Sequence, residues 1–277
     1  MRARPGRPGP LRPAHPLLRC PRWGESAATL CVLTLLLLTT AAGLIICGPS
    51  RPLRSVRTRS SSRTEDAYES FSPFEKLLFQ RFADSVATEL DDGSPSATTY
   101  SDLMAMINRM TFSRPLAQVN AQGKNMLVRL FPPWLLPMYK VLIQKPFPTF
   151  SAVMNCWVTK WTTNWLMGKS QVYDLPDDGG KQQGLLIEKC AFLESTGCVR
   201  TCLHACKIPT QAFFHDEMGL SVTLRPNTTD LSCRFLFGVE PTPLDLDEVR
   251  LSPCLDICSR RSKSDKTTIQ QPCVSLP

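Results

Sequence analysis

The pattern of apolar and polar positions predicts that the folded part of the chain begins with helices. Residues 72–75 (SPFE) have the form of a capping box with proline in the first turn, and apolar residues at helical spacing follow as far as Val86. The stretch 91–95 (DDGSP) should end this helix. A second helix is predicted over about 99–112, and a third over about 124–143, which three prolines interrupt.

The next segment, residues 148–168, is apolar and carries three tryptophans at a spacing of four. Trp157, Trp161 and Trp165 therefore fall on one face of a predicted helix. Such a stripe either packs in the core or forms a surface for lipid or for an extended apolar substrate, since tryptophan favours interfaces. On the second interpretation Trp157 and Trp161 are candidate substrate-binding residues. Lys160 interrupts the run, so we do not predict a membrane span here.

After a polar loop at 177–181 the pattern changes. Residues 185–206 are predicted to be helical with a break near Gly197. A new short helix is expected from Pro209 to Met218, with Gly219 as its C-terminal cap.

Two short strands are predicted near the end of the folded region. They cover Leu220–Leu224 and Ser232–Phe237 and are joined by the turn-prone segment 225–230. The sequence therefore predicts an α+β fold, mainly helical, with a small β-sheet in a cysteine-rich C-terminal region. We expect a helical region over 66–175, the cysteine-rich region over 176–262 and a tail over 263–277.

Composition sets residues 1–65 apart as a targeting leader. Residues 1–63 contain eleven arginines and one acid, a local net charge of +10, whereas residues 64–277 have 21 basic and 23 acidic residues. Because the basic excess lies in the leader, no nucleic-acid partner is expected. The apolar segment 27–48 precedes a stretch rich in arginine and serine, which has transit-peptide composition. This apolar segment is interpreted either as part of a removable leader or as a transmembrane anchor.

Seven of the twelve cysteines lie between positions 190 and 258. Cys198, Cys202 and Cys206 are four residues apart, as are Cys254 and Cys258, and residues four apart share one face of a helix. Thiolates in such a row can approach a single iron ion or an iron–sulfur cluster. Disulfides between two helices, or buried thiols that pack as small apolar side chains, remain alternative interpretations. The candidate metal ligands are Cys190, Cys198, Cys202, Cys206, Cys233, Cys254 and Cys258.

Other catalytic motifs are absent from the sequence. It contains no glycine-rich phosphate loop, no G-x-S-x-G and no H-E-x-x-H. Outside the leader only two histidines occur, His204 and His215, which are too few for a multi-histidine iron site. Cysteine is therefore the ligand type that the sequence favours.

The stretch 188–214 (EKCAFLESTGCVRTCLHACKIPTQAFF) resembles the signature of the dwarf-twenty-seven family, the beta-carotene isomerases of strigolactone synthesis. The resemblance continues through RPN at 225–227, DLSC at 230–233 and PCLDIC at 253–258. It is strong over about 185–260 and weak over about 70–170. Thr228 and Thr229 depart from the aromatic or acidic residues usual in the family after Asn227, which puts the substrate preference in question.

The resemblance implies an iron-containing plastid enzyme that isomerises all-trans-beta-carotene reversibly at the C9–C10 bond to the 9-cis form. Its implied partners are beta-carotene or a related carotenoid and the plastid membrane surface. Phe213 and Phe214, which lie in the signature, join Trp157 and Trp161 as candidate substrate-binding residues. Thiolate-bound iron could lower the bond order by one-electron transfer without acid–base groups. The alternatives are a disulfide-stapled lumenal or membrane-anchored protein without enzymatic activity, and an iron–sulfur electron carrier.

Overall fold

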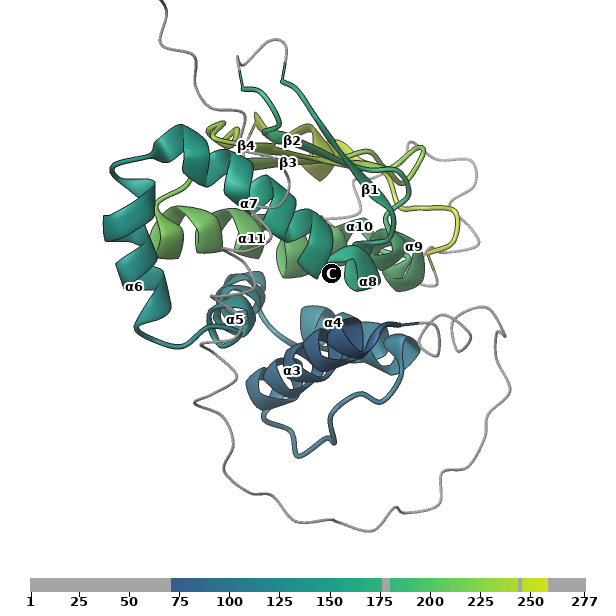
Figure 1. Ribbon diagram of the computed structural model, residues 1–277. Helices are drawn as coiled ribbons and strands as arrows, with labels where there is room; N and C mark the ends of the chain where they lie inside the picture. Colours follow the sequence, from purple (N-terminus) through teal and green to yellow (C-terminus); the bar gives the residue numbers. More distant parts are fainter. Residues whose placement is uncertain (1–70, 176–179, 244–245, 259–277) are drawn as a thin grey trace, which may run out of the picture. The chain divides into compact units, whose positions relative to one another are not determined.

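The computed structural model describes residues 71–175, 180–243 and 246–258, all within one compact unit of the chain (Figure 1). The predicted leader 1–65, with its apolar segment 27–48, and the tail 263–277 lie outside the described residues. The predicted α+β class is confirmed, since the described residues form helices and one small antiparallel sheet. In this part of the chain no helix combines the length and the apolar character that crossing a bilayer requires.

Helices make up the first part of the structure. The capping box is present: the Ser72 hydroxyl accepts the N–H of Glu75, and the Glu75 carboxylate accepts the N–H of Ser72 at 2.9 Å. The predicted third helix is wrong in its bounds, because the chain leaves the helix after Arg129 and Pro132 and Pro133 cannot donate to a helical ladder. The elements are α3 (Pro73–Leu90), α4 (Tyr100–Ser113), α5 (Leu116–Val128), α6 (Leu135–Tyr139), the π-helix η1 (Lys140–Gln144), α7 (Pro148–Thr162) and α8 (Asn164–Met167).

The sheet has the order β1-β2-β4-β3, and all its neighbouring strands are antiparallel. The predicted helix over 185–206 is wrong at its start, because residues 184–187 (GLLI) form the inner strand β2; a short apolar run fits a buried strand as well as a buried helix. The sequence pattern did not indicate β1, which lies before the predicted cysteine-rich region. The strands are β1 (Ser170–Tyr173), β2 (Gly184–Ile187), β3 (Val222–Pro226) and β4 (Cys233–Phe237).

Four of the eight cysteines in the described residues lie in the helical stretch between β2 and β3. The predicted break at Gly197 and the predicted cap at Gly219 are both present, and both glycines have a left-handed conformation. The prediction that Pro209 starts a new helix is wrong, since the helix runs on through it from a wide π-turn, which accommodates the proline ring. The segments are α9 (Ala191–Thr196), α10 (Val199–Thr201), η2 (Cys202–Lys207), α11 (Ile208–Ala212) and η3 (Phe213–Met218), and a 3-10 turn η5 (Glu248–Leu251) follows the sheet.

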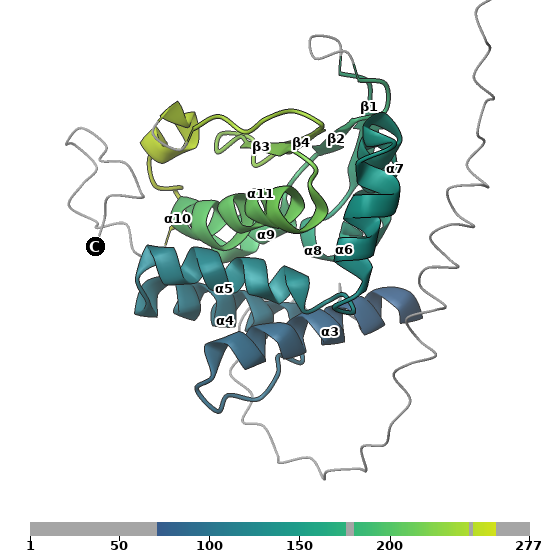
Figure 2. The same cartoon turned by 90° about the vertical axis from the view of Figure 1, so that its left-hand side faces the viewer.

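These cysteine-bearing helices lie between the sheet and the helices α3 to α5, as both views show (Figures 1 and 2). The approach of α5 to α11 is close, because a Cβ atom at Gly123 would stand only 2.7 Å from Cγ of Pro209. The helix η2 and its cysteines are therefore held in the core of the molecule.

Candidate functional site

Four cysteines line one small cavity in the core. Cys190 precedes α9, Cys202 and Cys206 lie on η2, and Cys233 begins β4. All four are free thiols. The rest of the wall is apolar apart from Lys207, and it consists of Met167, Phe192, Leu193, Leu224, Pro226 and Phe235.

Local backbone geometry brings these thiols together. In η2 the N–H of Ile208 donates to the carbonyl of Leu203, a π-type hydrogen bond across five residues. Single π-turns inside helices occur frequently at functional sites. The N–H of Cys190 donates to the Leu231 carbonyl at 2.7 Å, which fixes the start of α9 beside the loop that leads into β4. Three segments far apart in sequence thus converge on one cavity.

The environment of the cavity keeps its thiols protonated. Burial raises the pKa of Cys190, raises that of Cys206 to about 12, and raises those of Cys202 and Cys233 well above the ordinary value. Repulsion between neighbouring thiolates adds to this effect for Cys202, Cys206 and Cys233. The four thiols that line the cavity are therefore protonated. They become strong metal ligands only when a cation replaces their protons.

A buried ion pair adjoins the thiols. Lys207 lies on the cavity wall and pairs with Asp247, and both side chains are almost fully buried. A carboxylate oxygen of Asp247 also accepts the N–H of Val249 at 3.2 Å, at the start of η5. The positive charge of Lys207 favours the thiolate forms of Cys202 and Cys233, against the larger effect of burial.

The cavity fits an ion better than a hydrocarbon. Its volume is about 10 Å³, close to the space that one water molecule requires. Its donors are soft sulfur atoms, which suit iron or another thiophilic metal. Within the described residues, however, no group of three or more Cys, His, Asp or Glu side chains stands in an arrangement that could hold a metal ion. The four cysteine sulfur atoms surround one cavity, but in the described residues they do not stand in the arrangement that coordinates a metal ion.

The other three predicted ligands lie away from this cavity. Cys198 is buried at the N-terminus of α10, in extended backbone that precedes the helix, so it does not share the face of Cys202 and Cys206. Cys254 and Cys258 are partly exposed. Their segment reaches the start of α10, since a Cβ atom at Gly197 would stand 3.5 Å from the carbonyl oxygen of Ile257.

Phe213 and Phe214 belong to a row of five phenylalanine rings that leads to the thiol cavity. Successive ring centroids are 5.7 Å apart from Phe131 to Phe213, 5.4 Å to Phe214, 5.6 Å to Phe237 and 6.3 Å to Phe235, which lines the cavity. The sequence did not identify the other three members of this row, Phe131, Phe235 and Phe237. The alternation of Phe235 and Phe237 in a predicted strand was the signal that places both on one face of the sheet.

Comparisons with known proteins find a described family that matches the region containing this site. The family model described as Beta-carotene isomerase D27-like, C-terminal, matches residues 165–246, which include all four cavity cysteines and four rings of the row. The C-terminal part of the chain, residues 165–246, is therefore similar to the D27-like family. This confirms the family resemblance found in the sequence. No solved structure matches the chain.

Two relatives match different lengths of the chain. The Beta-carotene isomerase D27, chloroplastic, of Arabidopsis thaliana is 28% identical over 227 residues, which cover 80% of this chain and 83% of the relative. The protein of the same name from Medicago truncatula is 38% identical over 98 residues, 35% of this chain and 39% of the relative. Because both relatives are named as chloroplastic, the predicted plastid location is confirmed.

The tryptophan stripe divides into core and surface positions. Trp165 is buried against the rings of Phe79 and Phe82, with centroids 5.7 and 5.9 Å away. Trp157 and Trp161 are partly exposed and form their own pair at 5.6 Å. This pair is not part of the phenylalanine row, so the candidate substrate-binding residues occupy two separate places.

His204 gives the fold a measurable pH dependence. Burial, with the nearby positive charges of Arg200 and Arg250, lowers its pKa to about 4. Its Nδ1 donates to Asn120 Oδ1 at 2.9 Å, and its buried Nε2 has no hydrogen-bond partner among the described residues. In the unfolded chain His204 binds a proton below about pH 6.5. The free energy of unfolding should therefore drop by about 2 kcal/mol from pH 7 to pH 5.

Urea denaturation at the two pH values measures this difference. His204→Gln should reduce it, whereas His215→Gln, at an exposed position, serves as the control. An equal pH dependence in the wild type and in His204→Gln would contradict the assignment.

Proposed function

We propose that the protein is a carotenoid cis–trans isomerase that interconverts all-trans- and 9-cis-beta-carotene or a close relative of these. The names of its family relatives, both beta-carotene isomerases, support this function. The observation that carries it is the junction of the phenylalanine row with the cysteine cavity inside the region that matches the family model. An apolar path that ends at redox-capable ligands suits a hydrocarbon substrate without functional groups.

We propose further that Cys190, Cys202, Cys206 and Cys233 hold iron, either as a single ion or as part of a cluster. The support is the chemistry of the donor set, four thiols around a cavity of ionic size, with no carboxylate on its wall. Thiolate-bound iron would supply a one-electron donor or acceptor for a conjugated chain. Lys207 would offset part of the negative charge that the four sulfur atoms gain when they lose their protons.

The phenylalanine row is the proposed binding surface for the polyene. A conjugated chain is flat and apolar, and the faces and edges of aromatic rings are its natural partners. The cavity itself is too small for it, and Phe213, Phe214, Phe235 and Phe237 are buried. The polyene would therefore enter by displacing side chains of the row, and the bond to be rotated would come to rest near Phe235.

Expression in bacteria that accumulate beta-carotene tests the activity. The 9-cis fraction of the extracted pigment should rise when the chain is expressed, as measured by chromatography against a strain that carries an empty vector. Folded protein that leaves the isomer ratio unchanged would contradict the isomerase function. It would favour the alternative of an iron–sulfur electron carrier if the protein still contained iron.

Iron and sulfide analysis after anaerobic purification tests the cofactor separately. We expect iron in near-stoichiometric amount, lost together with activity on chelation. Metal-free protein that isomerises beta-carotene at the full rate would overturn the role of iron while leaving the isomerase function intact. Thiol titration under denaturing conditions tests the disulfide-stapled alternative, which predicts few free thiols, whereas a metal site predicts many.

A further inference from the structure

One short segment of the chain concentrates exposed apolar side chains. Of the thirteen large apolar residues that are exposed in the described part of the chain, eight lie between positions 130 and 150. We call them the apolar ridge, and they come from the α5–α6 connection, α6, η1 and the first turn of α7. The ridge consists of Leu130, Phe131, Trp134, Met138, Val141, Leu142, Phe147 and Phe150.

The ridge is a second apolar face on a helix whose other face is already packed. Leu136 and Tyr139 are buried against the rest of the protein, whereas Trp134, Met138 and Val141 follow at helical spacing on the outside. Residues 145–150 (KPFPTF) are all exposed and form the tip, where Phe147 is 60% exposed. Apolar residues all round a helix are typical of burial, and here the outer half lacks a cover in the described residues.

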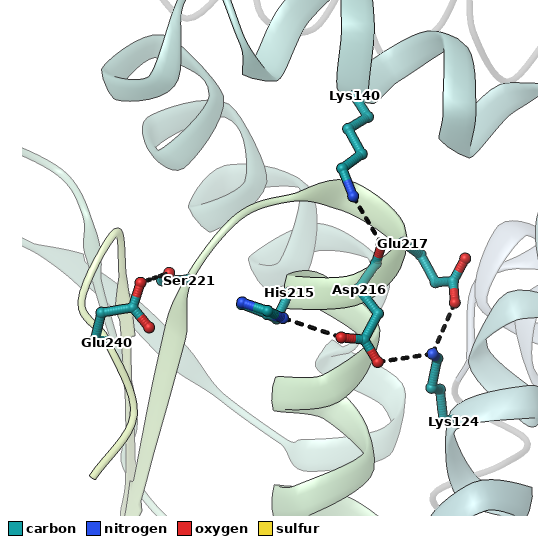
Figure 3. Close-up of polar contacts among 7 residues, drawn as sticks. All are labelled: Lys124, Lys140, His215, Asp216, Glu217, Ser221 and Glu240. Atoms are coloured by element: carbon teal, nitrogen blue, oxygen red, sulfur yellow. Dashed lines mark hydrogen bonds and ion pairs between the residues drawn. The ribbon is translucent and has the colours of Figure 1, made fainter. Parts of the chain in front are cut away.

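Polar contacts fix the inner side of this segment to η3 (Figure 3). The Lys140 ammonium group donates to the backbone carbonyl of Asp216 at 3.0 Å. The Asp216 carboxylate also binds Lys124 at 2.8 Å, and Glu217 binds the same lysine at 2.8 Å. The ridge is therefore presented by an anchored helix, and its outward direction is set by the fold.

The chain segment that carries the ridge has charged residues of one sign, whereas Asp216 and Glu217 of η3 pair with Lys124 on its inner side. Between Asp102 and Asp174 the sequence contains eight basic residues and no aspartate or glutamate. Lys145 is exposed at the tip beside the two phenylalanines. Exposed aromatic and aliphatic side chains combined with lysine and without acids are the composition of surfaces that enter the interface of an anionic bilayer. A second copy of the chain fits less well, because it would bring like charges together.

We propose that the apolar ridge docks the protein on the surface of an anionic lipid bilayer. The proposal extends the proposed function, since beta-carotene is a hydrocarbon that dissolves in membranes. Phe131 belongs both to the ridge and to the phenylalanine row, because its ring stacks on Phe213 at 5.7 Å. The docked surface thus coincides with the outer end of the path to the thiol cavity.

Trp134 provides a site-specific probe that works in the full chain. Protein is mixed with vesicles of phosphatidylcholine and one-third phosphatidylglycerol whose acyl chains carry bromine, which quenches tryptophan fluorescence at contact. In the wild-type protein the brominated lipid should quench the part of the fluorescence that Trp134 emits. Trp134→Phe lacks this emission and should therefore show less quenching. Trp157→Phe, which removes a tryptophan outside the ridge, should keep the quenching of Trp134.

A charge-introducing variant gives the second measurement. Leu142→Glu combined with Phe147→Glu should weaken the lipid quenching of Trp134 at least about tenfold in apparent affinity. Leu251→Glu, at another exposed leucine far along the chain, should leave it unchanged. No carotenoid is present, so failure of the isomerase function would not affect the result.

Two outcomes would overturn the proposal. One is equal quenching by brominated lipid in the wild type and in Trp134→Phe. The other is a dimer in solution whose Trp134 is shielded from a water-soluble quencher and which the double glutamate variant converts to monomer. The second outcome would assign the ridge to a second copy of the chain.

Discussion

Cys202→Ser should reduce the isomerisation of beta-carotene by more than about 100-fold. Loss of a partner that only orients a metal ligand typically costs 10- to 100-fold in affinity or activity, and loss of a ligand should cost more. Cys202 is the most central of the four thiols, since Cys190, Cys206 and Cys233 all influence its pKa. The measurements are the 9-cis fraction formed per unit of protein and the iron content of the same sample.

Cys156→Ser is the matched control. Cys156 is also a buried helical cysteine, on α7, and its thiol donates to the Gly184 carbonyl at 3.3 Å, but it does not line the cavity. This variant should retain iron and activity even if it loses some stability. If Cys202→Ser isomerises at the wild-type rate, or if the two variants lose activity equally, the cysteine cavity is not the site.

Asp247→Asn should lower the free energy of unfolding by about 3–5 kcal/mol. The substitution keeps an oxygen for the Val249 N–H but removes the negative charge that faces Lys207. Lys207 would then be a buried and unpaired charge, which is the costly outcome of breaking a buried ion pair. Urea denaturation at neutral pH measures the difference.

Glu194→Gln provides the comparison at the surface. Glu194 pairs with Lys189 at 2.7 Å, but both side chains are about half exposed. Its loss should cost less than about 1 kcal/mol, because water solvates the remaining charge. Equal and small effects in the two variants would show that Lys207 reaches solvent when its partner is removed.

Local signals predicted the early helices well. The capping box at Ser72 and the stop at Asp91 depend on residues close in sequence, so they are readable without tertiary information. The strand β2 could not be predicted in this way, because a run of four apolar residues is too short for its periodicity to distinguish a strand from a helix. The continuation of the helix through Pro209 depends on a π-turn, which has no sequence periodicity of its own.

The site was predicted in part. The spacing of Cys202 and Cys206 placed them correctly on one face, but the same rule failed for Cys198, where the backbone is extended. Cys190 and Cys233 join this group through two long-range contacts, the pairing of β4 with β2 and the hydrogen bond from Cys190 to Leu231. Local sequence patterns do not reveal such contacts. Phe131 could not be linked to Phe213 from the sequence, since they are 82 residues apart in different helical segments.

The π-turns of η2 and η3 constrain the length of the chain as well as its composition. Each turn holds one residue more than an α-helical turn, so deletion of one residue within it can close it to the α form while the helix beyond keeps its direction. A deletion in α11, which has no extra residue, would instead rotate the residues beyond it by about 100°. Phe213 and Phe214 would then leave the phenylalanine row while remaining helical. Among homologous genes, single-residue gaps between Cys202 and Gly219 should therefore fall within η2 or η3 and not within α11.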